Sequence, residues 1–392
     1  MSRWRSAPRI ASVEHARELA RRRLPSSVYW FIEGGTEADL TVRANEQAFD
    51  QIGFRPRVAN DHLPKGLATT VLGRELAMPV ITAPAGLIRI AHSDGELGVA
   101  RAAEAAGIAV GVSILASHSI EAITDVASDV WFQLYMIGGR DGTEVAIDRA
   151  RAAGCRVLMV TVDKAAATGG KDRPRVRSEV PSHIDLKTAL RFAPEVLLRP
   201  RWGYNFLKGG LRLEVPNAPT VVPGEVMTVS EGGAALSEYP PTWDDIAWIR
   251  EQWDGPFVVK GIVSPDDARH AADLGVDAVS VSNHGGNSLD GGPAAIDALP
   301  AIVEAVDDRI EVLLDGGIRR GGDVVKAVAL GARAVLIGRG YVWPLAVSGE
   351  QGVHEILQLF RRGIDATLAL LACPSIQGLG PEHLILRNDT SR

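Results

Sequence analysis

From residue 78 onward, the chain alternates short apolar runs with longer stretches of helical pattern. Eight runs, rich in β-branched residues and ending in small or polar ones, begin at residues 78, 107, 131, 156, 257, 278, 311 and 334. Several of the stretches between them carry apolar residues at helical spacing and Gly near their C-terminal ends. Strands that are apolar throughout and alternate with helices are typical of a parallel sheet with a covered outer face. Eight such units predict an α/β fold, the TIM (β/α)8 barrel.

Two regions do not follow this repeat: one precedes it, and the other lies within it. Residues 1–77 predict a helical N-terminal segment, in which Ser12 caps the first helix and Pro25 ends it. The long stretch after the fourth strand contains no clear strand, and its residues 185–202 predict an amphipathic, basic helix. We interpret this insertion as a lid on the barrel mouth, with a docking surface for a membrane or an electron-accepting partner as the alternative. We expect one domain over residues 1–392, divided into the segment 1–77, the barrel at 78–163 and 244–370, the lid at 164–243 and a tail at 371–392.

Composition and charge exclude several classes of protein. The 392 residues are 46% hydrophobic and 23% charged, which excludes a disordered or fibrous chain. A net charge of −6 offers no overall attraction for nucleic acid, so no such partner is expected. Two cysteines suit a reducing compartment, no apolar run reaches the roughly 18 residues of a membrane span, and the Arg-rich N-terminus lacks the apolar core of a secretory signal. We therefore expect a cytoplasmic protein, and no metal site is predicted.

Polar residues gather where the predicted strands end. The active site of a TIM barrel lies at the C-terminal ends of its strands, so these positions outweigh polar residues elsewhere. They are Ser113, Gln133, Tyr135, Thr161, Asp163, Lys260, Ser282, Asn283, His284, Asp315, Arg319, Gly338 and Arg339. The seventh and eighth strands end in the Gly-rich, Arg-bearing turns DGGIRRGG and IGRG. Such turns at these two strands predict a site for a phosphate-bearing ligand.

His284 is the candidate general base. It directly follows the sixth strand, and imidazole exchanges protons most readily near neutral pH. Asp163, at the end of the fourth strand, is placed to orient the ring and to stabilise its protonated form. Lys260 projects from the fifth strand, where a buried ammonium needs an anion, and a negative charge developing on a cofactor would be one. These residues predict proton transfer beside a bound cofactor.

Together the motifs resemble the FMN-dependent 2-hydroxy-acid oxidase and dehydrogenase family, which includes glycolate oxidase, lactate oxidase and the flavin domain of flavocytochrome b2. The resemblance covers nearly the whole chain, through LPSSVYWFIEGG, LGRELAMPVITAPAG, FQLY, TVD, VVKGI, SNHGG, LDGGIRRG and IGRG. It implies the catalytic residues His284 as base, Asp163 as its partner, Tyr135 as hydrogen-bond donor to the substrate and Lys260 as stabiliser of the reduced flavin. It also implies FMN as the cofactor, held by Pro84, Ala85, Gly86, Ser113, Gln133, Thr161, Lys260, Ser282, Asp315, Gly316, Gly317, Ile318, Arg319, Gly338 and Arg339.

The chain departs from the family pattern where the substrate carboxylate is bound. Asn287 stands where the family carries an arginine that clamps the carboxylate bidentately. A second family arginine falls near Gly170, although Lys171 or Arg173 could replace it. An asparagine cannot supply the charged, fixed fork of a guanidinium. We therefore expect a larger substrate that lacks the usual carboxylate.

The substrate is expected to contact Phe31, Tyr135, His284 and Asn287, with Phe31 where a tyrosine is usual and Leu115 where an aromatic residue is common. SNHGGNSLDG, PPTWDDIAWIREQWDGPF and DGGIRRGGDVVKAVALGARAV are similar to the pre-mycofactocin synthase branch, which implies oxidative deamination of a peptide-derived lactam, a small-molecule substrate. An L-2-hydroxy-acid oxidase or dehydrogenase, and more distantly a non-catalytic phosphate-binding barrel, are the alternatives. The electron acceptor, whether oxygen, a quinone or a carrier, stays open, and analogy favours a homo-oligomer.

Overall fold

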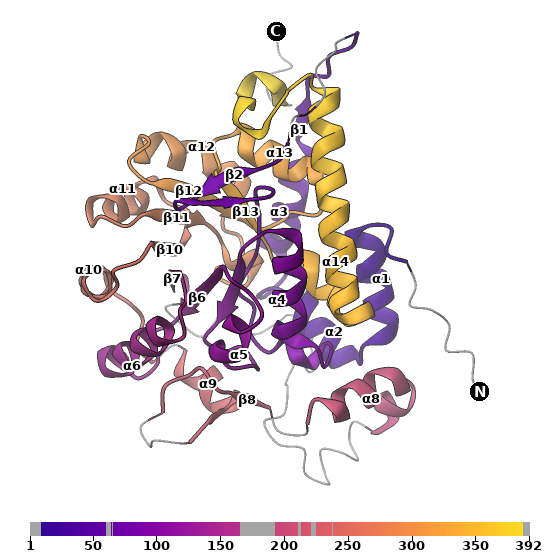
Figure 1. The fold of residues 1–392 in the computed structure, drawn as a ribbon, viewed down its shortest axis with the longest axis vertical. Coiled ribbons are helices and arrows are strands. Elements are labelled where there is room, and N and C mark those ends of the chain that lie inside the picture. The colour runs from indigo at the N-terminus through magenta and orange to yellow at the C-terminus, as the bar shows by residue number, and fades with distance from the viewer. Residues whose placement is uncertain are drawn as a thin grey trace.

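The computed structural model describes residues 9–59, 64, 66–164, 193–210, 213–220, 225–236 and 238–386. Eight parallel strands form a closed barrel at its centre, one strand at each predicted apolar run (Figure 1). Around the barrel the strands follow the order β10, β11, β12, β13, β4, β5, β6 and β7. Their bounds are β4 Val80–Thr82, β5 Val110–Ser113, β6 Val130–Leu134, β7 Val157–Thr161, β10 Phe257–Ile262, β11 Ala278–Val281, β12 Glu311–Asp315 and β13 Ala334–Ile337. The predicted TIM barrel is confirmed.

Every second residue of each strand points into the barrel. On β10 the inward positions are Val258 and then Lys260, and on β12 they are Leu313 and then Asp315. Apolar side chains fill the lower interior, namely Val71, Leu76, Ile81, Ala83, Ala109, Trp131, Val157, Met159, Val258, Ala278, Leu313, Ala334 and Leu336. The two-residue period therefore places the polar inward side chains in a layer above a dry core, at the C-terminal mouth.

A hairpin closes the opposite, N-terminal mouth. It consists of β2 (Thr69–Val71) and β3 (Arg74–Leu76), and its turn residue is fixed to the barrel from both sides. The N–H of Leu72 donates to the Glu311 carboxylate at 3.1 Å, and the Leu72 carbonyl accepts a hydrogen bond from Arg156 at 2.9 Å. Because apolar side chains of this hairpin plug the N-terminal end, ligand chemistry is expected at the other end.

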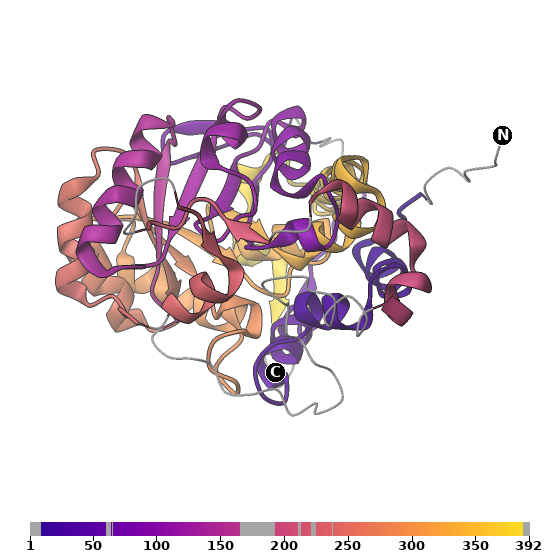
Figure 2. The ribbon, with the colours of Figure 1, turned by 90° about the horizontal axis from the view of Figure 1, so that it is seen from below.

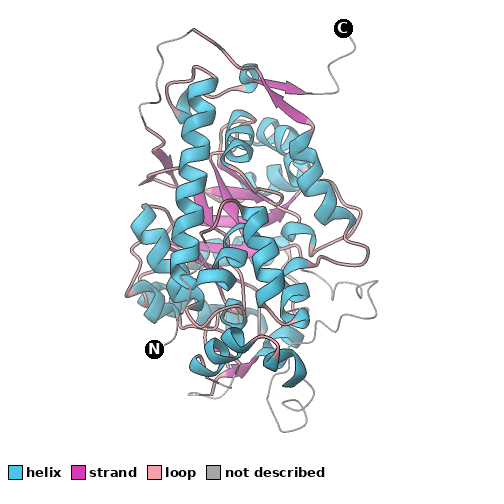
Figure 3. Cartoon of the chain, turned by 90° about the vertical axis from the view of Figure 1, so that its right-hand side faces the viewer, coloured by secondary structure: helices cyan, strands magenta, loops and turns pink. Residues whose placement is uncertain are grey.

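Helices cover the outside of the barrel (Figures 2 and 3). The longest described helix, α14, bends at Ser348 and Gly349, whose backbone angles are not helical. The described helices are α1 Val13–Arg23, α2 Ser26–Glu33, α3 Leu40–Asp50, α4 Gly95–Ala106, α5 Ile120–Thr124, α6 Gly139–Ala152, α8 Pro200–Lys208, α9 Val229–Ala235, α10 Trp243–Gln252, α11 Pro265–Asp273, α12 Ala295–Val306, α13 Gly321–Ala329 and α14 Arg339–Leu370. Short 3₁₀ turns are η1 Ile88–Ile90, η2 His284–Gly286, η3 Ile376–Gly378 and η4 Pro381–His383.

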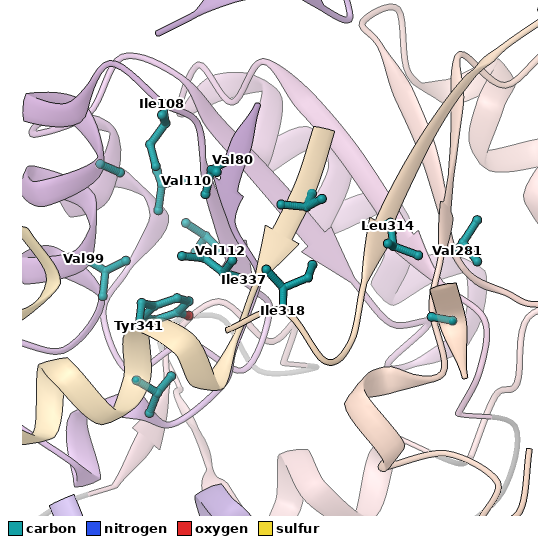
Figure 4. Close-up of a cluster of buried hydrophobic side chains, with 14 of the residues drawn as sticks. Val80, Val99, Ile108, Val110, Val112, Val281, Leu314, Ile318, Ile337 and Tyr341 are labelled. Atoms are coloured by element: carbon teal, nitrogen blue, oxygen red, sulfur yellow. The ribbon is translucent and has the colours of Figure 1, made fainter. Parts of the chain in front are cut away.

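The outer face of the barrel packs on these helices through aliphatic side chains. Figure 4 shows Val80, Val110 and Val112 of β4 and β5 on the side that faces Val99 of α4. Tyr341, near the start of α14, lies below them and donates its hydroxyl to the Ala83 carbonyl at 2.8 Å. The barrel strands are therefore apolar on both faces, as the continuous apolar runs predict.

The N-terminal segment begins as the sequence predicts. The Ser12 side chain accepts the His15 N–H and caps α1, which ends at Arg23, two residues before Pro25. Farther along, α3 packs against η2 and α12 on the barrel. A ribbon of β1 (Ile52–Phe54) and β14 (Leu384–Leu386) then pairs this segment with the tail of the chain. The segment therefore belongs to the same packed unit as the barrel.

The insertion after β7 differs in two respects from the sequence prediction. It contains a short antiparallel ribbon, β8 (Glu214–Val215) with β9 (Met227–Thr228), where no strand was expected. The helix predicted at 185–202 lies partly outside the described residues. Its described part is helical at 193–197 and breaks at Arg199, because the residue before Pro200 is driven out of the helical conformation; α8 then begins with Pro200 at its first position.

No helix in the described part of the chain is long and apolar enough to span a bilayer.

The barrel interior predicts where a single truncation is costly. Leu313→Ala should lower the free energy of unfolding by about 2–5 kcal/mol, because it leaves a cavity in a packed core. Leu370→Ala, at the exposed end of α14, is the matched control and should change it by less than about 0.5 kcal/mol. Urea unfolding of the two variants, followed by circular dichroism, measures both. Equal midpoints would contradict the packed interior.

Candidate active site

A buried ion pair lies at the centre of the C-terminal mouth. The Lys260 ammonium on β10 is 2.5 Å from the Asp315 carboxylate on β12 and donates to the Ser282 hydroxyl at 2.7 Å. The Ser282 hydroxyl in turn donates to Asp315 at 2.7 Å. The anion that the buried Lys260 requires is therefore supplied by the chain itself, where we expected a cofactor to supply it. A cofactor bound with one edge at this cluster would face the Lys260 ammonium, which Asp315 and Ser282 already hold in place.

Ser113 and Gln133 form a second buried polar pair beside the first. The Ser113 hydroxyl at the end of β5 donates to the Gln133 side-chain carbonyl at 2.9 Å, and the Gln133 amide NH₂ donates to the Leu134 carbonyl at 2.9 Å. These two bonds fix which way the amide points. Thr161 lies buried on the neighbouring strand β7 and pairs in register with Lys260. The structure thus brings these predicted cofactor residues onto adjacent strand ends.

His284 and Asp163 meet as the sequence analysis expects. The Nδ1 atom of His284 is 2.9 Å from the Asp163 carboxylate, and its Nε2 atom is 3.4 Å from the Tyr135 hydroxyl. Burial opposes the charge on Asp163, but the nearby His284 and Lys260 outweigh it and hold the pKa of Asp163 below its usual value. Asp163 is therefore an anion that keeps the proton on Nδ1 and leaves Nε2 as the basic nitrogen. Burial raises the pKa of Tyr135, so its hydroxyl stays protonated and can donate.

The turn that carries His284 is held in a strained conformation. His284 has φ 58°, in the left-handed region that a β-carbon disfavours. Its N–H donates to the Ser282 hydroxyl at 3.1 Å, and the Asn283 side chain accepts the Gly286 N–H at 3.1 Å. Asn283 also exchanges two 2.8 Å hydrogen bonds with Asn45 of α3. The N-terminal segment therefore stabilises the strain that aims the imidazole into the mouth.

Arg339 ties the same turn to the N-terminal segment. Its guanidinium donates to the carbonyls of Ile32, Gly34 and Gly285 at 2.8, 3.0 and 2.6 Å. Burial lowers the pKa of Arg339 to about 10, and the neighbouring Arg319 adds to this shift. Two neighbouring guanidinium groups are typical of a site that receives an anion.

Arg319 is positioned by an aromatic ring and a carboxylate. It lies over the Trp343 ring at 5.0 Å, with Arg17 over the same ring at 5.3 Å, and it pairs with Glu46 at 2.8 Å. Its buried Nε–H has no hydrogen-bond partner among the described residues. A donor of this kind beside a second guanidinium fits the phosphate of FMN. Arg17 and Glu46 are not part of the sequence prediction, because only the fold brings α1 and α3 to this turn.

Glycines allow close packing at two of the turns that carry predicted cofactor residues. A β-carbon on Gly317 would lie 2.1 Å from the Asn45 carbonyl oxygen, so the turn after β12 tolerates no larger residue. A β-carbon on Gly86, in the loop after β4, would lie 2.9 Å from the side chain of Leu115. Of the remaining predicted cofactor residues, Pro84 and Ala85 lie in the loop after β4, Gly316 and Ile318 in the turn after β12, and Gly338 directly after β13.

The predicted substrate residues surround the histidine only in part. Asn287 ends the histidine turn, and its backbone carbonyl accepts a hydrogen bond from the ammonium of Lys164. Phe31 is half-buried on α2. Gly170, Lys171 and Arg173 lie outside the described residues. Lys164 is absent from the prediction, although its place directly after the TVD strand end is the signal that would have found it.

Similarity to known proteins extends over nearly the whole chain. The model of the FMN-dependent dehydrogenase family matches residues 20–386. A pre-mycofactocin synthase from Mycolicibacterium smegmatis is 46% identical over 388 residues, which cover 97% of this chain and 95% of that protein. An L-lactate oxidase from a Nostoc species is 37% identical over 374 residues, covering 94% and 96%. The solved structure of the monotopic membrane protein (S)-mandelate dehydrogenase has a TM-score of 0.86 at 34% identity and covers 96% of this chain and 99% of that one.

The anion site formed by Arg319 and Arg339 predicts that FMN affinity falls when Arg319 is removed but not when the adjacent Arg320 is removed. Arg319→Ala should weaken FMN binding by about 10- to 100-fold, the loss typical of one charge-assisted hydrogen bond. Arg320→Ala is the control, because that side chain is 74% exposed whereas Arg319 is 16% exposed. Fluorescence titration of the apoprotein with FMN measures both affinities. Equal effects of the two substitutions would place the phosphate elsewhere.

Proposed function

The chain belongs to the FMN-dependent dehydrogenase family with FMN as its cofactor, and on that premise we propose that it oxidatively deaminates a peptide-derived lactam in the manner implied for pre-mycofactocin synthases. The observation that carries the oxidative chemistry is the His284–Asp163 pair at 2.9 Å, set at the barrel mouth beside the buried Lys260. A base with an anionic partner, next to a cofactor cradle, suits proton removal coupled to electron transfer.

His284 would take the proton of the amine-bearing substrate on Nε2 while Asp163 stabilises the imidazolium that forms. Tyr135 would donate its hydroxyl to the substrate heteroatom and hold it against the histidine. FMN, when bound, supplies the acceptor for the hydride equivalent. The substrate loses two electrons and two protons in all, one hydrogen from the amine-bearing carbon and one from the amine nitrogen, and the resulting imine is hydrolysed by water to a ketone and ammonia.

The absence of a guanidinium at Asn287 supports a neutral substrate. A simple 2-hydroxy acid would need its carboxylate to be neutralised, and the family clamp for it is replaced by a neutral amide. The Lys164 ammonium is engaged by the Asn287 carbonyl, which joins the end of β7 to the histidine turn. A lactam amide places no such demand on the site. Identity of 46% to a pre-mycofactocin synthase, against 37% to a lactate oxidase, points the same way.

His284→Ala should leave FMN bound and slow flavin reduction by about 10²- to 10⁴-fold, because it removes the general base. His270→Ala is the matched control, since that histidine lies exposed on α11. Anaerobic stopped-flow bleaching of the flavin with an amine-bearing lactam measures the rate. An unchanged rate would remove His284 from the base role, and a colourless protein that cannot be reconstituted with FMN would contradict the oxidoreductase itself.

Asn287→Arg should raise flavin bleaching by lactate or mandelate at least about tenfold, because it restores one charge-assisted clamp, and should not raise bleaching by a lactam amine. The two substrates in one panel serve as controls for each other. If the unaltered protein already oxidises 2-hydroxy acids faster than lactam amines, and Asn287→Arg changes neither rate, the 2-hydroxy-acid alternative is the correct one.

A further inference from the structure

The described end of the insertion exposes a cluster of large apolar side chains. Leu197, Leu198, Tyr204 and Leu207 are 79, 76, 67 and 63% exposed, and we call these four residues the α8 patch. The first two lie just before α8 and the others on it. Single exposed apolar residues are common on protein surfaces, but four within residues 197–207 are a concentration that favours an interaction site.

The opposite face of α8 fixes how this patch is displayed. Trp202 stacks on Phe206 at 5.0 Å, and its indole N–H donates to the Ile90 carbonyl at 2.8 Å. Gly203 allows close contact with Val196 of the preceding turn. Ile90 lies in η1, which follows β4, so α8 is anchored on the side of the barrel where the strands end. Helix α8 lies at the edge of the molecule in Figure 1, and the exposed side chains of the patch therefore face solvent near the rim of the C-terminal mouth.

Cations surround the patch. Arg201 and Lys208 are exposed on α8, and α1 ends in the basic run Arg21 to Arg23. Burial lowers the pKa of Arg23 at the end of α1, and the charge of Arg201, in the first turn of α8, lies close enough to add to this shift. The carboxylate of Glu195 nearby accepts the Ser26 N–H at 2.8 Å. The surface is thus locally basic on a chain whose net charge is −6.

We propose that the α8 patch docks the protein on an anionic lipid bilayer. A helix that presents Leu and Tyr between Arg and Lys is suited to lie in the plane of the interface, with apolar side chains at the level of the acyl boundary and cations at the lipid phosphates. Docking in this way places the mouth of the barrel at the membrane surface. This inference is independent of which substrate the site oxidises.

The FMN-loaded full chain is tested on vesicles of phosphatidylcholine alone and of phosphatidylcholine with phosphatidylglycerol. Flotation should recover the protein with the anionic vesicles, and recovery should fall when salt rises from about 0.05 to about 0.5 M, because screening weakens attraction between exposed charges. Absence of binding to anionic vesicles at low salt would overturn the proposal. Self-association that is lost with the patch, without vesicle binding, would replace the bilayer by a second copy of the chain.

Matched variants separate the patch from general stickiness. Leu197→Ser with Leu198→Ser should lower vesicle affinity at least about tenfold, because two partly inserted side chains are lost. Leu370→Ser is the control, since Leu370 is 66% exposed at the end of α14. An unaltered flavin spectrum shows that each variant is folded. Equal binding of the patch variant and the unaltered chain would overturn the proposal.

A single label identifies the inserted face. Both cysteines of the chain, Cys155 and Cys373, are buried, so an introduced surface cysteine reacts selectively. Leu207→Cys carrying an environment-sensitive fluorophore should shift its emission to the blue on anionic vesicles, and Leu370→Cys carrying the same fluorophore should not. A shift at Leu370 alone would place the docking surface elsewhere on the molecule.

Discussion

The ion pair between Lys260 and Asp315 is the contact on which the catalytic mouth depends. It joins β10 to β12 past the intervening strand β11, and the Ser282 hydroxyl between them also accepts the His284 N–H at 3.1 Å. Breaking a buried pair by removing one partner typically costs about 3–5 kcal/mol, so its geometry is held firmly. One cluster therefore fixes both the buried Lys260 ammonium and the start of the turn that carries His284.

The N-terminal segment completes that turn from the other side. Asn45 pairs with Asn283, and Arg339 holds the carbonyls of Ile32, Gly34 and Gly285 together. These bonds stabilise a histidine at φ 58°, a conformation that costs about 1–3 kcal/mol and persists only where the surroundings enforce it. The helices before the barrel are thus structural parts of the site, because they stabilise the turn that orients the His284 side chain.

The proposals for substrate and for membrane docking rest on the segments that depart most from the barrel repeat. The end of β7 brings Lys164 to the carbonyl of Asn287, at the position where the family carries a carboxylate clamp. The insertion that begins there anchors α8 on the loop after β4 through Trp202 and presents the α8 patch outward. The chemistry therefore lies on rigid strand ends, whereas the features that distinguish this chain lie on the loops that surround them.

The sequence by itself determined the barrel, because strands buried on both faces must be apolar throughout and the eight runs show this directly. It also predicted the strand-end residues that the fold brings together, including His284, Asp163, Lys260 and Asp315, since parallel strands end at one mouth. Only the tertiary structure decided their partners: Asp315 for Lys260, Asn45 for Asn283, and Arg17 and Glu46 around Arg319. Local sequence cannot state these contacts, because each joins side chains far apart in the chain, and their distances depend on how the N-terminal helices pack across the mouth of the barrel.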